Sequence, residues 1–494
     1  SPIAPILSAR LRRIIRATRS PRHPIGNRPK ETMPLKVIYL SPSRVYGRVA
    51  RPHVGATGDP MTSPVLLTGQ VLSFSANPFL EGPSAAHLEP DGAVFLSQGR
   101  IMAIGPRAAL RHAHPDVPVI SYGQHLLTAG FVDAHVHYPQ TAIIASWGKR
   151  LIDWLNTYTF PEEMRFGDPA YAAEISARYL DLVLAQGTTT VASYCTIHPE
   201  SVEAFFSAAA ARGMRVIAGK TCMDRDTAPE GLRDTAQSAY DQSKALIDRW
   251  HGKGRAGYAI TPRFSPTSTP DQLHALGALW AEHPDCAMQT HLSEQTDEIA
   301  WVKSLYPEAR DYLDTYERAG LIGAGAVFGH AIHLEPRERA RLAETRSAVV
   351  HCPTSNTFIG SGLCDVAGLI AQGIPVGLAT DTGGGSSFSM LRTMAAAYEV
   401  GQLRGRPLHA SELVWLATEG SAAALRLSGT IGHMGVGAEA DITVLDLAST
   451  PAIAQRHARA NDFWEALFPT LMMGDDRAIC ATWVGGALRH SRPS

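Results

Sequence analysis

The middle of the chain alternates between short apolar runs and longer segments of helical periodicity. Segments such as "PAYAAEISARYLDLVLAQG" and "SVEAFFSAAAARG" have the helical pattern, and the second ends on a glycine suited to a helix C-cap. Eight strand-like runs over about 300 residues, most of them separated by helices, predict a (β/α)8 barrel of the α/β class. These runs end near His137, Cys195, Lys220, Arg263, His291, His330, Cys352 and Asp381.

Alternating strands of a second kind lie on both sides of this region. "PVLLTGQVLSF" and "GAVFLSQGRIMAIGP" precede it, and "ADITVLDL" and "ICATWVGGALRH" follow it, with glycine and proline between the runs. Strands at both ends predict a small β-sandwich domain built from both termini. We therefore expect residues 61–128 and 428–494 to form this domain, and residues 129–427 to form the barrel.

The first 60 residues are basic and show no sustained period. They hold twelve Lys and Arg against two acids, Glu31 and Asp59. "ARLRRIIRATRSPRHP" has the Arg-rich, acid-poor character of an organellar transit peptide. The favoured interpretation is a disordered extension, or a region translated ahead of a start at Met61, with little fixed structure.

Composition excludes several classes of function. Outside that basic segment the chain carries 33 basic and 44 acidic side chains, which argues against nucleic-acid binding. No run of 18 apolar residues predicts a membrane span. Six scattered cysteines without a C-x-x-C pair suit reduced thiols and a cytoplasmic protein, and they exclude a deaminase of the cytidine type, which needs P-C-x-x-C.

Reactive residues gather where the predicted barrel strands end. The active face of such a barrel is formed by the C-terminal ends of its strands. His135 and His137 are one residue apart, so in a strand they point to the same face about 6.6 Å apart, a geometry that any polar pair shares. His291, His330 and Asp381 end other strands, and together these groups fit a divalent ion such as zinc with a water at an open position.

Glu294 follows His291 in "THLSE" and has two interpretations. A carboxylate on the loop after the fifth strand is placed to protonate a substrate and then its leaving group. The same residue also precedes the helical segment "SEQTDEIAWVKSLY", where an acid commonly caps a helix. The pattern alone favours neither interpretation.

At this point the sequence resembles a known family. "GFVDAHVHYPQ", "DWLNTYTFPEEMRF", "GTTTVASYCTIH", "GKTCMD", "TPRFS", "HLSE", "HCPTSN", "TDTGGGSSFSML" and "GDDR" are similar, in order, to segments of the guanine deaminases within the zinc-dependent amidohydrolase superfamily. The resemblance extends from Leu66 to Arg489. "YTFPEE" together with "TPRFS" is its most specific part.

The resemblance implies a role for each candidate residue. Glu294 would be the proton shuttle, Asp381 would also accept a proton from the water, and His330 would hydrogen-bond the reacting groups. The implied metal ligands are His135, His137, His291 and Asp381. The implied substrate-binding residues are Gln140, Arg263 and Phe264 together with His137, His291, Glu294 and Asp381.

The implied reaction is hydrolytic deamination of guanine to xanthine and ammonia, a step of purine catabolism or salvage. Amide and guanidinium groups read the polar edge of a purine, and Phe offers a stacking face. The resemblance also implies a homodimer. One Zn²⁺ per chain is expected, because strand four ends in Arg263 and has no lysine to bridge two metals; Lys220 is expected to pair with nearby acids instead.

Two alternatives stay open at this stage. One is an amidohydrolase that acts on a related heterocycle, such as an 8-oxopurine, a triazine or a thio-adenosine compound. The other is a catalytically silent scaffold of the same fold, against which the complete ligand set argues. His333 and His351 are interpreted as structural or supporting residues.

Overall fold

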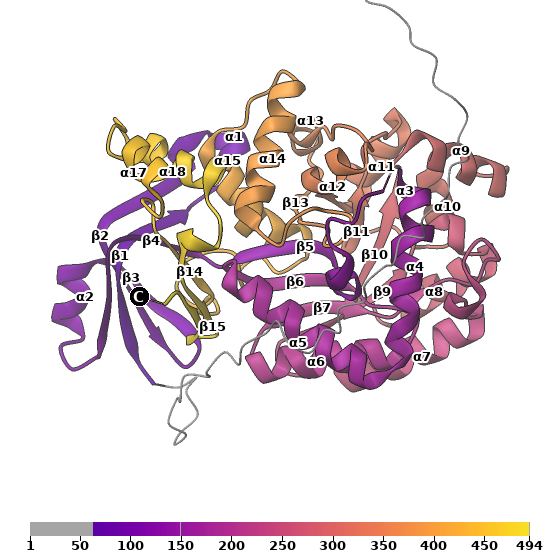
Figure 1. The fold of residues 1–494 in the computed structure, drawn as a ribbon, viewed down its shortest axis with the longest axis horizontal. Helices are drawn as coiled ribbons and strands as arrows, with labels where there is room; N and C mark the ends of the chain where they lie inside the picture. The colour runs from indigo at the N-terminus through magenta and orange to yellow at the C-terminus, as the bar shows by residue number, and fades with distance from the viewer. Residues whose placement is uncertain (1–62, 149, 494) are drawn as a thin grey trace, which may run out of the picture. The chain divides into compact units, whose positions relative to one another are not determined.

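A parallel barrel forms the larger part of the computed structural model, which describes residues 63–148 and 150–493. The strands follow the order β13-β12-β11-β10-β9-β7-β6-β5, and the short β8 (Thr221–Cys222) pairs with β9. Figure 1 shows these strands within the helices. The barrel and the α/β class are confirmed. The barrel strands are β5 (Phe131–His137), β6 (Thr188–Tyr194), β7 (Arg215–Gly219), β9 (Ala256–Pro262), β10 (Ala287–Leu292), β11 (Ala326–His330), β12 (Ala348–His351) and β13 (Val376–Leu378).

Helices connect most of the strands, as the periodicity predicts. The helix expected to end on Gly213 does so, with that glycine in the left-handed region at φ 67°. After β5 the chain forms α3 (Leu151–Trp154), a π-helical turn (Leu155–Thr159) and α4 (Phe160–Glu163). The other barrel helices are α5 (Pro169–Ala185), α6 (Pro199–Arg212), α7 (Ala236–Trp250), α8 (Pro270–Glu282), α9 (Thr296–Leu305), α10 (Tyr312–Arg318), α11 (Pro336–Thr345), α12 (Pro353–Phe358), α13 (Val366–Ala371), α14 (Met390–Leu403), α15 (Ala410–Trp415) and α16 (Ser421–Ala424).

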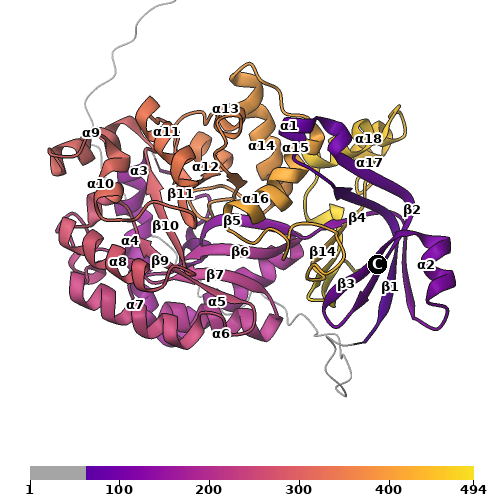
Figure 2. The same ribbon diagram turned by 180° about the vertical axis from the view of Figure 1, so that it is seen from behind.

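Both ends of the described chain build a second sheet, as expected. Its strands form one continuous seven-stranded sheet in the order β16-β15-β14-β4-β1-β2-β3, visible from both sides in Figures 1 and 2. Hydrogen bonding runs through the whole sheet, because β4 pairs with β1 on one side and with β14 on the other. The strands are β1 (Val65–Phe74), β2 (Ala86–Ser97), β3 (Arg100–Pro106), β4 (Val119–Ala129), β14 (Ile442–Leu445), β15 (Ile479–Val484) and β16 (Ala487–Ser491).

Register shifts within this sheet help it to enclose a core of its own. They occur in the β1–β2, β2–β3 and β14–β15 pairs, and such irregularities bend strands. Val94, Ile101, Val444 and Trp483 share this apolar cluster. Helices α1 (Pro78–Glu81), α2 (Arg107–Ala113), α17 (Pro451–His457) and α18 (Phe463–Met473) complete the segments at either end.

The terminal sheet is attached at the N-terminal side of a barrel strand. Thr443 donates a hydrogen bond to the carbonyl of Gly187 (2.6 Å), and Thr482 donates one to the carbonyl of Leu184 (2.7 Å). Both acceptors precede β6, which begins at Thr188. This attachment leaves the C-terminal ends of the barrel strands available for a site.

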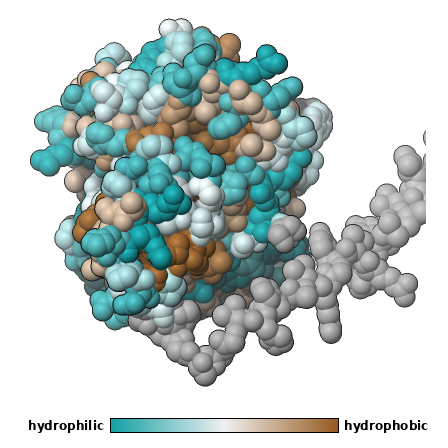
Figure 3. Space-filling model, turned by 90° about the vertical axis from the view of Figure 1, so that its left-hand side faces the viewer, coloured by the Kyte–Doolittle hydropathy of each residue, from teal (hydrophilic) through white to brown (hydrophobic). Residues whose placement is uncertain are grey.

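The side of the molecule toward the terminal sheet carries small apolar patches separated by polar side chains (Figure 3). In the described residues, no helix has the length and apolar character needed to cross a membrane. The prediction for residues 1–60 lies outside the described residues, and the boundaries at 128/129 and 427/428 stay predictions.

Candidate active site

Four predicted metal ligands converge at the C-terminal ends of the barrel strands. His135 and His137 lie on β5, His291 lies on β10, and Asp381 follows β13. The Nε2 atoms of His137 and His291 are 3.1 Å apart. Oδ1 of Asp381 is 3.5 Å from Nε2 of both His135 and His137. All four side chains are buried, although they are far apart in the sequence, because the barrel topology gathers the strand ends.

The protonation of these imidazoles suits a cation. Nδ1 of His291 donates to the carbonyl of Arg263 (2.7 Å), so its Nε2 presents a lone pair to the site. Nε2 of His135 is buried and has no hydrogen-bond partner among the described residues. Burial, reinforced by neighbouring imidazoles, lowers the pKa of His135, His137 and His291 well below the usual range. Neutral imidazoles and one carboxylate, with lone pairs facing one another, are the ligands that divalent zinc takes.

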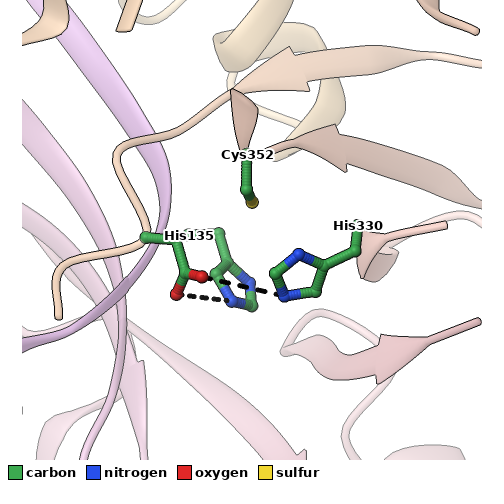
Figure 4. A group of neighbouring side chains, drawn as sticks. His135, His330 and Cys352 are labelled. Atoms are coloured by element: carbon green, nitrogen blue, oxygen red, sulfur yellow. Dashed lines mark ion pairs between the residues drawn. The ribbon is translucent and has the colours of Figure 1, made fainter. Parts of the chain in front are cut away.

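Cys352 and His330 lie beside the same cluster. Figure 4 shows His135, His330 and Cys352 around a carboxylate, and these groups together with Asp381 form a second possible ligand set. Burial raises the pKa of the Cys352 thiol well above its usual range. Burial without a metal ion therefore favours the protonated thiol, and we interpret Cys352 as a packing residue next to the ligands.

Asp381 is positioned by Asp133, which closes the barrel between β5 and β13. The Asp133 carboxylate accepts hydrogen bonds from the backbone N–H (2.9 Å) and the hydroxyl (2.6 Å) of Thr380. The N–H of Asp381 in turn donates to the carbonyl of His135 (3.0 Å). Burial raises the pKa of Asp381 to about 7. Asp133 therefore holds a predicted ligand through the residue that precedes it.

Replacing Asp133 with asparagine is expected to lower metal affinity or kcat by about 10- to 100-fold, the usual cost of losing a group that orients a metal ligand. The asparagine oxygen could still accept from the backbone N–H of Thr380, but the NH2 group would replace the oxygen that accepts from the Thr380 hydroxyl. Metal content, kcat and melting temperature would be measured together. Asp91→Asn, which changes an exposed carboxylate, is the control. Wild-type metal content and kcat in Asp133→Asn would contradict this positioning role.

Glu294 lines the pocket and does not cap helix α9, and its role as proton shuttle stays a prediction. Helix α9 is capped by Gln295, and Glu298 accepts the N–H groups of Glu294 (2.9 Å) and Gln295 (3.1 Å). The Glu294 side chain does not cap the helix. It accepts a hydrogen bond from Ser361 (2.8 Å), and its Oε2 lies 3.6 Å from Nε2 of His330. Burial raises the pKa of Glu294 above its usual range, which suits a group that has to carry a proton to the substrate.

His330 lies between two carboxyl groups. Its Nε2 is 3.6 Å from Glu294 and 3.8 Å from Asp381. Because the Oδ1 of Asn356 accepts at 2.8 Å, Nδ1 of His330 carries the proton and Nε2 faces the carboxyl groups. This placement agrees with a role in hydrogen bonding to reacting groups.

The predicted substrate residues share one pocket. Phe264 contacts His291 and Trp301 edge to face, with ring centroids 6.3 and 6.4 Å apart. Every predicted site residue except His135 lines the pocket. Its lining consists of His137, Gln140, Leu151, Trp154, Leu155, Arg263, Phe264, His291, Glu294, His330, Ile359, Asp381 and Gly384.

Residues interpreted as structural lie outside the pocket lining. Lys220 is fully buried and paired with Asp234, as predicted. Nε2 of His333 donates to the carbonyl of Ser361 (2.8 Å). Burial lowers the pKa of His351 to about 3, and neither ring nitrogen has a hydrogen-bond partner among the described residues.

Sequence reasoning missed four residues that support the site. Each lies within or beside a motif that carries the family resemblance, which is the signal that could have identified them. They are Asp133 in "FVDAHVH", Glu163 in "YTFPEE", Asn356 in "HCPTSN" and Ser361 shortly after that motif.

Known proteins agree with this geometry. The profile of the amidohydrolase family matches residues 126–488, and that of an imidazolonepropionase-like composite domain of bacteria matches residues 92–116. Guanine deaminase of Escherichia coli K12 is 45% identical over 410 residues, which cover 83% of this chain and 93% of that protein. The chain belongs to the guanine deaminases of the amidohydrolase family.

Solved structures of guanine deaminases have the same fold as this chain. The structure of the E. coli enzyme has a TM-score of 0.85 at 44% identity and covers 87% of this chain and all of its own. A guanine deaminase from C. acetobutylicum with bound guanine in its active site has a TM-score of 0.78 at 27% identity, over 86% of this chain and all of its own. Members of this superfamily are generally metal-dependent, which agrees with the histidine-rich ligand set.

Proposed function

We propose that this protein is a guanine deaminase that hydrolyses guanine to xanthine and ammonia. The observation that carries the proposal is the pocket. It contains side chains of the kind that bind zinc, the buried carboxyl group of Glu294, and the polar groups of Gln140 and Arg263, which suit the edge of a purine. The chain is 45% identical to the E. coli enzyme and similar to a relative with bound guanine, and both similarities support guanine as the substrate.

One zinc ion per chain is part of the proposal, held by His135, His137, His291 and Asp381. When bound, such an ion supplies Lewis acidity and makes water reactive near neutral pH. The ion would also satisfy the unpartnered Nε2 of His135. Homodimerisation and a cytoplasmic location stay predictions.

The side chains move the protons that the reaction requires. Asp381 accepts a proton from the attacking water as its oxygen bonds to C2 of guanine. Glu294 protonates the ring nitrogen beside C2, and the resulting carboxylate takes the proton of the new C2 hydroxyl and passes it to the exocyclic amine. The amine leaves as ammonia when the C2–N bond breaks and the C2 carbonyl forms, and the proton held by Asp381 returns to Glu294. His330 lies within 4 Å of both carboxyl groups and orients the reacting oxygen by hydrogen bonding.

Guanine is selected by the polar groups of the pocket, among which the amide oxygen of Gln140 has no hydrogen-bond partner in the described residues. Gln140 and Arg263 provide the polar wall, and Phe264 provides an apolar face for the ring. A pocket built to hydrogen-bond a substrate rejects an analogue without those groups, because its buried polar atoms are then left unsatisfied. Adenine should therefore be a poor ligand.

A substrate panel tests the proposal. Guanine should be turned over with the highest kcat/KM, at least about 100-fold above adenine, 8-oxoguanine, an aminotriazine and a thio-adenosine compound. Absorbance changes and ammonia release would be followed for each compound with the same zinc-loaded protein. Failure to release ammonia from guanine would contradict the assignment, and a better rate on another heterocycle would replace the substrate.

A further inference from the structure

Glu163 joins the two polar groups of the pocket wall. It is the last residue of α4 and is buried. Its Oε1 accepts a hydrogen bond from Nε2 of Gln140 (2.9 Å), and its Oε2 accepts one from Nη1 of Arg263 (2.8 Å). Both carboxylate oxygens are thus committed to residues that line the pocket, although Glu163 itself does not line it.

This contact fixes which way the Gln140 amide points. A carboxylate only accepts hydrogen bonds, so the NH2 group of Gln140 must face Glu163. The amide oxygen therefore points the other way. It is buried and has no hydrogen-bond partner among the described residues. A buried acceptor without a partner is unfavourable, and a ligand N–H in the pocket would satisfy it.

The same carboxylate fixes Arg263. The guanidinium is held at Nη1 by Glu163, and its central carbon lies 5.5 Å from the ring centroid of Phe160. The guanidinium has further N–H groups that can donate. The wall consequently presents one acceptor, from Gln140, and donors from Arg263.

We propose that Glu163 is a positioning residue that makes the pocket specific for a lactam edge, a ring carbonyl beside a ring N–H. Gln140 accepts from the N–H, and Arg263 donates to the carbonyl. Guanine has this edge at N1 and O6, so the inference rests on the proposed function and extends it to a specificity determinant. Adenine and unsubstituted purine do not have this edge.

The substitution Glu163→Gln should turn the hydrogen-bond acceptor that Gln140 presents to the ligand into a donor. The introduced amide offers one acceptor and one NH2 group, and the Arg263 guanidinium cannot accept a hydrogen bond. The introduced oxygen therefore faces Arg263 and the introduced NH2 faces Gln140. The Gln140 amide then has to turn, so that its oxygen accepts from the introduced NH2 while its own NH2 faces the ligand. A lactam N–H would then meet a donor.

Binding of two unreactive ligands tests this inference independently of catalysis. Hypoxanthine has the lactam edge but no amine at C2, and purine has neither. Calorimetry with the zinc-loaded wild-type protein should give a Kd for hypoxanthine at least about 10-fold below that for purine. Glu163→Gln should raise the hypoxanthine Kd by about 10-fold or more and the purine Kd by less than about 3-fold.

The neighbouring Glu162→Gln is the matched control. Glu162 is also buried on α4, but it accepts hydrogen bonds from Arg165 and Tyr171. That variant should keep the wild-type ratio of the two Kd values. Glu163→Asp is the substitute variant if Glu163→Gln folds poorly. It keeps the charge but is too short to reach both partners, so it should change the ratio of the two Kd values in the same direction as Glu163→Gln.

A double-mutant cycle separates positioning from general stability. In a Gln140→Leu background no amide can turn, so Glu163→Gln should add little to the hypoxanthine Kd. An unchanged Kd ratio in Glu163→Gln and Glu163→Asp, or fully additive effects in the cycle, would overturn the inference. If the wild-type protein binds hypoxanthine selectively but releases no ammonia from guanine, the proposed function fails and the role of Glu163 stands.

Discussion

Replacing Glu294 with glutamine is expected to reduce kcat for guanine by roughly 10²- to 10⁴-fold, the usual contribution of a general acid–base group. The amide fits the same space and still accepts a hydrogen bond from Ser361, but it cannot donate a proton and take it back. Metal content should stay at the wild-type level, because Glu294 belongs to neither of the two possible ligand sets at the site. Steady-state kinetics and metal analysis of the same preparations measure both quantities.

Two further variants serve as controls for the loss of kcat in Glu294→Gln. Glu308→Gln changes an exposed carboxylate that follows α9 and should leave kcat unchanged. Ser361→Ala removes the hydroxyl that donates to Glu294 and should give a smaller loss than Glu294→Gln. Turnover near the wild-type rate in Glu294→Gln would refute the proton-shuttle role.

The barrel and its principal site residues are predictable because both follow from local patterns. Strand β5 is buried along its whole length, so "FVDAHVH" reads as an apolar run with its polar residues near the end. Once eight such runs alternate with helices, barrel topology brings their C-terminal ends together. This topology explains why His135, His291 and Asp381 meet although no local signal connects them.

The supporting contacts were not predictable, because they depend on pairing across long distances in the sequence. Glu163 accepts a hydrogen bond from Arg263, which lies 100 residues away in the sequence, and Asp133 accepts one from Thr380, which lies 247 residues away. Neither acid differs locally from an ordinary helix-end or strand residue. The strand order of the terminal sheet was not predictable for the same reason, since periodicity indicates strands but not that β4 pairs with both β1 and β14.

Removing the metal is expected to reduce guanine turnover by at least about 100-fold, because the side chains of the site cannot by themselves make water reactive at neutral pH. Protein dialysed against a chelator should be inactive, and zinc should restore its activity. Its melting temperature should fall, because an ion that binds only the folded state stabilises that state.

The zinc content of two histidine variants tests which site binds the ion. The described residues contain another possible ligand group, in which His125 lies with Asp446 and Cys480 in and beside the terminal sheet. We expect about one zinc per chain in the wild-type protein and in His125→Asn, and almost none in His291→Asn. Full activity in the metal-free protein would contradict the mechanism. Loss of the ion in His125→Asn with retention in His291→Asn would move the metal site to the terminal sheet.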